Sequence, residues 1–98
     1  MPRSPDDLDL DVPEWVEELE NECLREILIE SLFTRAKAIR FGAWSIRRVR
    51  NVILSADATV EQIRMGRYRK ESDACNKATT TMRKYASAYE HVTRKLDE

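Results

Sequence analysis

The sequence has little of what interrupts a helix. It contains only two glycines, and its three prolines all lie within the first thirteen residues. Because glycine and proline are the strongest helix breakers, the remaining eighty-five residues offer few points at which a helix must end. Charged residues make up 36% of the chain and are spread along it, which is typical of long solvated helices. These features predict an all-α protein.

The sequence also lacks the segments that direct a chain to a membrane or a secretory route. It has no run of about eighteen apolar residues that could span a bilayer, and its N-terminus is acidic where a signal peptide would be apolar. Its two cysteines, Cys23 and Cys75, are 52 positions apart, a spacing that fits neither a disulfide framework nor a metal pair. We therefore expect no membrane association, a cytoplasmic location and two buried, reduced thiols.

Residues that carry catalysis are equally scarce. The single histidine, His91, falls on the polar side of its predicted helix, and no acidic residue stands three positions before it as di-metal helix motifs require. Gly42 and Gly66 are too far apart to form a phosphate-binding loop. The sequence therefore predicts no enzyme, no catalytic residue, no metal, no cofactor and no small-molecule substrate.

Apolar residues recur at helical spacing along most of the chain. Residues 13–41 are predicted to form one long helix that starts near Pro13 and ends at Gly42. The next helix has its inner face at Ile46, Val49, Ile53 and Ala56. The last helix has its apolar side at Ala74, Ala78, Met82, Tyr85, Tyr89, Val92 and Leu96. This pattern predicts a small antiparallel bundle of three to four helices.

The pattern leaves the second half of the chain open between two arrangements. One has a break near residues 55–59 and an exposed stretch over residues 66–73. The other is a continuous helix over residues 43–97, about 80 Å long at roughly 1.5 Å per residue, which would need a partner chain beside it. In either arrangement, residues 1–12 form an acidic N-terminal tail and residues 13–98 form a single helical domain.

Two apolar residues lie outside the main stripe of the first long helix. Ile29 and Phe33 are one turn apart, so that the helix is apolar on nearly every side around residues 27–33. A helix segment of this kind requires partners on more than one side. We therefore expect a homodimer, or another homo-oligomer, with Ile29 and Phe33 at the interface.

Charge is unevenly placed along the chain. Residues 1–30 hold eleven acidic and two basic residues, whereas residues 31–98 hold seven acidic and fifteen basic residues. The basic residues that stand out form two clusters, each with a nearby aromatic side chain. The first basic cluster contains Arg40, Trp44, Arg47, Arg48 and Arg50, and the second basic cluster contains Arg64, Arg67, Arg69 and Lys70.

Arginine recognises carboxylates and phosphates and also stacks on aromatic rings, so the two clusters predict an anionic partner. The favoured hypothesis is a non-enzymatic interaction protein that binds a protein partner, such as an adaptor or a small inhibitor from a phage or virus. The alternative is a nucleic-acid backbone binder, for example of duplex RNA, which acts as a helical dimer through the arginine clusters.

Overall fold

The computed structural model describes residues 10–97, and all regular secondary structure in that range is helical. It contains α1 (Glu14–Glu17), α2 (Glu22–Arg40), the short 3₁₀ helix η2 (Ala43–Ser45), α3 (Arg47–Arg64) and α4 (Glu71–Asp97). The predicted all-α class is therefore confirmed, with four α-helices in the described part of the chain. None of these helices is both long enough and apolar enough to cross a membrane.

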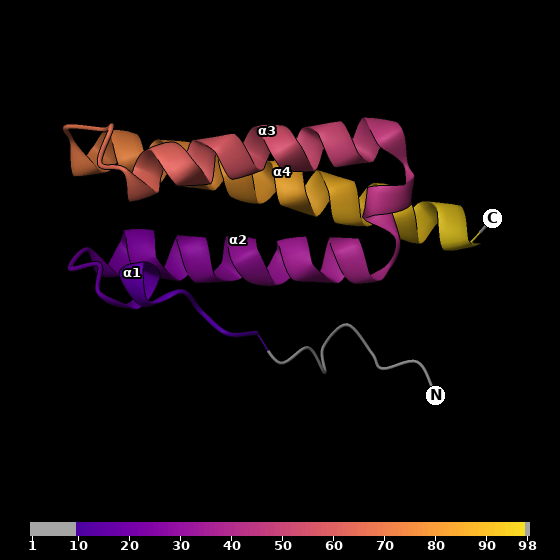
Figure 1. The fold of residues 1–98 in the computed structure, drawn as a ribbon, viewed down its shortest axis with the longest axis horizontal. Coiled ribbons are helices and arrows are strands. Elements are labelled where there is room, and N and C mark those ends of the chain that lie inside the picture. Colours follow the sequence, from indigo (N-terminus) through magenta and orange to yellow (C-terminus); the bar gives the residue numbers. More distant parts are fainter. Residues whose placement is uncertain (1–9, 98) are drawn as a thin grey trace.

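The three long helices alternate in direction along the long axis of the molecule, which is horizontal in Figure 1, and the molecule measures 44 × 26 × 16 Å. Short turns join them, so α3 is antiparallel to both α2 and α4, whereas α2 and α4 are parallel to each other. Helix α4 packs against both α2 and α3, and α1 packs on α2. The second half of the chain is thus two helices joined by a turn, and the continuous rod over residues 43–97 does not form.

Buried residues along each long helix are spaced alternately by about four and three positions. This is the spacing at which side chains of neighbouring helices interdigitate at a shallow crossing angle. The buried positions are Leu24, Leu28, Ser31 and Ala38 in α2, Val49, Ile53, Ala56 and Ile63 in α3, and Ala74, Ala78, Thr81, Tyr85, Ala88 and Val92 in α4. Three alanines on the α4 stripe allow the neighbouring helices to approach it closely.

Two residues on these stripes are polar and were not predicted to be buried. The Ser31 hydroxyl donates to the carbonyl oxygen of Ile27 at 2.6 Å, and the Thr81 hydroxyl donates to that of Lys77 at 2.9 Å. Each hydroxyl is therefore satisfied within its own helix, which removes most of the cost of burying it.

The predicted long first helix is interrupted, and this part of the prediction was wrong. Helix α1 ends at Glu17, and α2 begins after Asn21, whose side chain accepts a hydrogen bond from the Leu24 backbone N–H at 2.9 Å. Asparagine is among the best residues for such a helix N-cap, so Asn21 starts a new helix. At the other end of α2, Gly42 has a φ of +101° and ends the helix as predicted.

Two further predictions need correction. The break near residues 55–59 does not occur, because Ala56 is buried in the core and α3 continues through it. The two thiols are not both buried, since Cys23 is exposed and Cys75 is half-buried. Of the predicted acidic tail, residues 1–9 lie outside the described residues, and Val12 packs partly buried against the core near α1.

Candidate functional site

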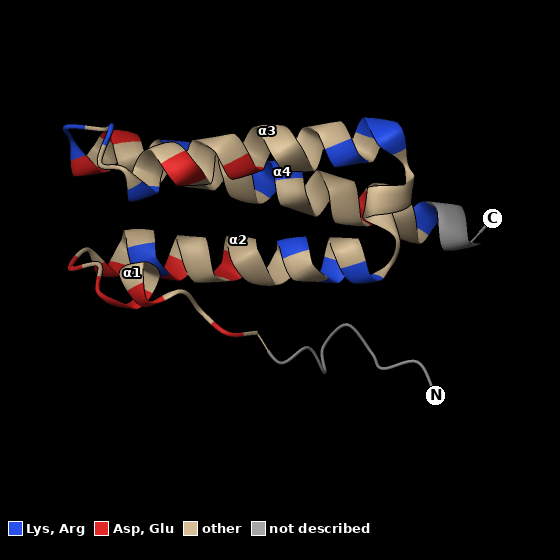
Figure 2. Cartoon of the chain, viewed as in Figure 1, with Lys and Arg blue, Asp and Glu red and all other residues tan. Residues whose placement is uncertain are grey.

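The two basic clusters lie at opposite ends of the bundle. The first basic cluster surrounds the turn between α2 and α3, and the second surrounds the turn between α3 and α4. Figure 2 shows Lys and Arg at both ends of α3. Since α3 has 18 residues, about 27 Å of helix at ~1.5 Å per residue separates the two ends. The structure therefore does not join the two clusters into a single patch.

The first basic cluster concentrates positive charge where α3 begins. Arg47 and Arg48 are exposed in the first turn of α3, which contains no acidic residue and no side-chain cap. The N-terminal end of a helix already carries partial positive charge, so these arginines increase the positive electrostatic potential there and are repelled by it. Trp44 is 40% exposed beside them, and its carbonyl oxygen accepts a hydrogen bond from the Arg50 Nη1 atom at 3.5 Å. This end of the molecule would favour the approach of an anionic group.

The second basic cluster is partly neutralised. The Arg64 guanidinium pairs with the Glu61 carboxylate one turn earlier in α3. The Glu61 carboxylate raises the pKa of Arg64, and the Arg64 guanidinium lowers the pKa of Glu61. Arg67, Arg69 and Lys70 are exposed in the following turn. The second cluster is therefore a less concentrated source of positive charge than the first.

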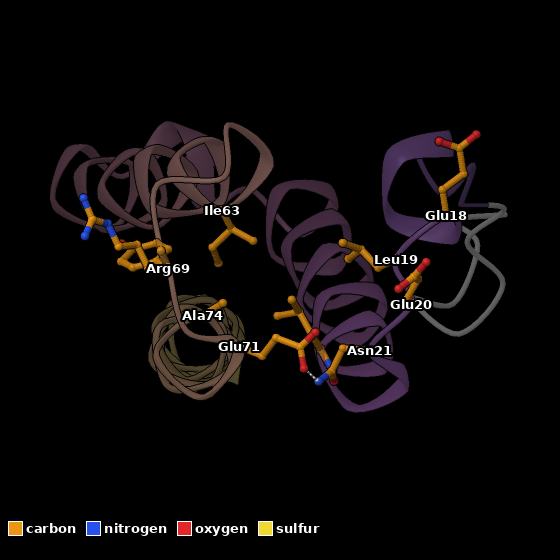
Figure 3. A pocket seen from close by; sticks show the side chains of 10 residues that line it. Glu18, Leu19, Glu20, Asn21, Ile63, Arg69, Glu71 and Ala74 are labelled. Carbon is orange, nitrogen blue, oxygen red and sulfur yellow. Dashed lines mark hydrogen bonds between the residues drawn. The ribbon is translucent and has the colours of Figure 1, made fainter.

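A pocket of about 320 Å³ opens at the same end of the bundle, between α2, α3 and α4. Its apolar lining is Leu19, Leu24, Ile63 and Ala74, and its rim contains Glu18, Glu20, Glu71 and Arg69. Figure 3 shows the Arg69 guanidinium pointing out of this pocket. The Glu71 carboxylate is bound by the Asn21 side-chain amide at 2.9 Å. This hydrogen bond joins the N-terminal ends of α2 and α4. No group of three metal-ligating side chains occurs in the part of the chain that the structure describes.

A shallow groove follows the line where α3 meets α4. It consists of two adjoining hollows of about 360 and 340 Å³ that share Arg48 and Val52. We call it the α3–α4 groove, and it is lined by Arg48, Val49, Asn51, Val52, Ser55, Lys84, Ser87, Ala88 and His91. The apolar floor of the groove is formed by Val49, Val52 and Ala88, of which only Val52 is more than a few per cent exposed, and Arg48 and Lys84 contribute cationic side chains from the two helices.

The charged side chains that line this groove, Arg48 and Lys84, are both positive. Arg48 joins it to the first basic cluster, and the Lys84 Nζ atom donates to the Ser55 Oγ atom at 3.2 Å across it. None of the described residues that line it is acidic. Beside the groove, Arg47 and Leu54 lie on the outer surface of α3, each one helical turn from the lining residue Asn51, and Leu54 is 46% exposed. Groove and outer surface together give a cationic site with apolar contacts.

The predicted interface residues of α2 are partly covered within the chain itself. Ile29 packs against the core cluster near α1. The Phe33 ring is half-buried, and the Lys37 Nζ atom lies 4.9 Å from its centroid. Both side chains keep some exposed surface, but neither belongs to the α3–α4 groove.

A partly exposed polar network that links the three long helices was not predicted. The Asp57 carboxylate in α3 accepts two hydrogen bonds from Arg35 in α2, at 2.8 and 2.9 Å, and one from the Tyr85 hydroxyl in α4, at 2.5 Å. It joins all three long helices. The one signal in the sequence is that Arg35 continues the alternating spacing of Leu28 and Ser31, at a position where an apolar residue is expected.

The electrostatics of this network favour a structural role. Burial raises the pKa of the Tyr85 phenol far above its ordinary range, and the Asp57 carboxylate adds to the effect. The hydrogen bond to Asp57 raises the pKa of Arg35. Both donors thus keep their protons, so the network holds the helices in register without transferring a proton.

Sequence proximity identified the residues of the first basic cluster but missed the α4 side of the groove, because Lys84, Ser87 and His91 are far from Arg48 in the sequence. Comparison with known proteins found no matching family model, no similar curated protein and no similar solved structure.

The geometry defines the candidate site as the α3–α4 groove together with the first basic cluster, and the two meet at Arg48.

Proposed function

We propose that this chain is a non-enzymatic interaction protein that binds an acidic, amphipathic helical segment of a protein partner in the α3–α4 groove. The observation that carries the proposal is the combination of an apolar floor with cationic side chains from both helices. An amphipathic helix lies in such a groove through its apolar face, and its acidic residues would meet Arg48 and Lys84.

The first basic cluster supports the same partner chemistry. Its arginines lie at the positive end of α3 with no acidic residue in that turn to balance them. Carboxylates of a partner would remove this unfavourable potential on binding, and Trp44 would supply an exposed aromatic contact. Charge complementarity of this kind mainly sets specificity and the rate of association.

The alternative is a binder of nucleic-acid backbone, and the exposed arginines beside Trp44 favour it. A backbone binder requires cationic side chains along the path of the phosphates. Here the second basic cluster is about 27 Å away along α3 and is partly neutralised by Glu61. The apolar floor of the groove also has no role in binding phosphates, so we favour the protein partner.

A binding experiment distinguishes the two functions. The probes are a fluorescein-labelled 18-residue amphipathic helix of Leu and Glu, a matched helix of Leu and Lys, and a generic RNA duplex, each followed by fluorescence anisotropy. We expect the acidic helix alone to bind. Binding of the duplex with a steep salt dependence, and no binding of the acidic helix, would support the alternative instead.

Charge reversal locates the site on the protein. Arg48→Glu should weaken binding of the acidic helix by about tenfold or more, equivalent to about 1.4 kcal/mol or more. Arg83→Glu is the matched control, because Arg83 is exposed on α4 but does not line the groove, and it should change the affinity by less than about twofold. Equal effects of both variants would contradict binding in the groove.

The homodimer stays a proposal of its own. Ile29 and Phe33 retain some exposure on α2, away from the α3–α4 groove, so a dimer through them would leave the groove free. Light scattering of the wild type and of Phe33→Ser tests this: a dimeric mass that the substitution reduces to that of a monomer supports the dimer. A monomeric wild type would contradict it.

A further inference from the structure

The fold brings the two cysteines together, although 52 positions separate them in the sequence. Because α2 and α4 are parallel, their first turns lie side by side at the same end of the bundle (Figure 1). Asn21, which caps α2, contacts both Glu71 and Cys75 of α4, and its Oδ1 atom lies 4.0 Å from the Cys75 sulfur. Cys23 is two residues beyond Asn21, in the first turn of α2.

The two thiols differ in their surroundings in a way that assigns them different chemical roles. Burial raises the pKa of the Cys75 thiol, and the neighbouring Cys23 thiol and Glu71 carboxylate raise it further. Cys23 lies two residues after Asn21, whose Oδ1 atom is 4.0 Å from the Cys75 sulfur, so the two thiols are neighbours. Cys23 is also exposed, whereas Cys75 is half-buried. An oxidant in solution therefore meets Cys23 first, and Cys75 is placed to react with it second.

We propose that Cys23 and Cys75 form a reversible intramolecular disulfide that ties the first turn of α2 to the first turn of α4. The oxidant is a small-molecule disulfide such as oxidised glutathione. The Cys23 thiolate attacks it, which forms a mixed disulfide and releases one glutathione thiolate. Cys75 then loses its proton to water and attacks the Cys23 sulfur, which forms the protein disulfide and releases the second glutathione.

The reaction balances without another reactant. The two protein thiols lose two electrons in total, and one glutathione disulfide gains them to become two glutathione thiols. The bridge would close a loop that contains α2, η2 and α3, so it would restrict the unfolded chain strongly and leave the helix packing in place. The proposal does not depend on the function assigned to the α3–α4 groove.

The test uses the full chain in glutathione buffers of increasing oxidised fraction. The readouts are the number of free thiols, found by maleimide–polyethylene glycol labelling under denaturing conditions, the mass on a non-reducing gel, and the midpoint of thermal unfolding. We expect both thiols to disappear together, the chain to remain a covalent monomer, and the midpoint to rise by about 10 °C or more.

Single-cysteine variants are the controls. Cys23→Ser and Cys75→Ser should each keep one thiol that forms only a mixed disulfide or a covalent dimer, with no rise in the unfolding midpoint. The proposal is overturned if the wild-type thiols are lost independently, or if chains cross-linked through Cys23 are the main product. It is equally overturned if both thiols of the folded wild type stay reduced while a denatured sample oxidises.

Discussion

Replacing Asp57 by alanine should destabilise the bundle more than any other single change of a surface-accessible charge. The carboxylate accepts one hydrogen bond from Tyr85, which is fully buried, and two from Arg35, whose side chain is 33% exposed. Leaving the buried Tyr85 hydroxyl without its acceptor costs about 2 kcal/mol. The partly exposed ion pair contributes about 1 kcal/mol or less because water screens it. We therefore expect Asp57→Ala to lower the free energy of unfolding by about 3 kcal/mol.

Urea denaturation of Asp57→Ala, Tyr85→Phe and the double variant isolates the contribution of the hydrogen bond. Because the two groups are in direct contact, the double variant should lose about 2 kcal/mol less than the sum of the single variants. Glu90→Ala, on an exposed position of α4, is the control and should change the free energy of unfolding by less than about 0.5 kcal/mol. Additive single effects, or a cost of Asp57→Ala below about 1 kcal/mol, would refute the assigned role of the network.

Three further predictions concern pH and the helix ends. Since burial raises the pKa of Tyr85, its stabilisation is complete below the pKa of an unfolded tyrosine, about 10, and is lost as the pH rises above that value. The free energy of unfolding of the wild type should therefore fall more steeply between about pH 10 and 11 than that of Tyr85→Phe, and equal slopes in urea denaturation would contradict the buried phenol. Asn21→Ala removes the N-cap of α2 and should cost about 1 kcal/mol in the same assay, while Asn21→Gly should cost only a few tenths. Gly42→Ala forces a residue with a Cβ atom into a φ of +101° and should lower the free energy of unfolding by about 1 kcal/mol or more, whereas an unchanged stability would show that the α2–α3 turn adopts a different conformation.

The core of α3 could be predicted from the sequence because its buried positions are apolar and recur at helical spacing. Val49, Ile53 and Ala56 were assigned to the inner face, and all three are buried. In α2 and α4 the same reasoning missed Ser31 and Thr81. Both side chains are polar, but each hydroxyl donates a hydrogen bond to a carbonyl oxygen of its own helix. These hydrogen bonds allow the two side chains to be buried, and the spacing of apolar residues in the sequence does not reveal them.

The interactions between helices could not be predicted, because they depend on how each helix is rotated against its neighbours. The spacing of Arg35 places it on the same stripe as Leu28 and Ser31, but it does not show that the partner of Arg35 is Asp57 of another helix. Cys23 and Cys75 meet only because α2 and α4 are parallel, which follows from two turns and not from either cysteine.

Only part of the candidate site could be predicted from the sequence. The first basic cluster is continuous in sequence and falls at one end of the bundle, so it could be identified directly. The second cluster lies at the other end of α3, and a straight helix of 18 residues places the two clusters about 27 Å apart. Lys84 and His91 reach the groove from α4, and nothing near them in the sequence indicates that they face Arg48.

An amide chemical-shift map by ¹⁵N-edited NMR, recorded while the unlabelled acidic Leu–Glu helix is added, tests the proposed binding surface most directly. The largest shifts should fall on the groove residues of both helices, at Val52, Ser55, Ser87 and Ala88, and extend through Arg48 to the start of α3. Shifts confined to the opposite end of the bundle, around Glu18, Arg69 and Glu71, or no shifts at all, would contradict it.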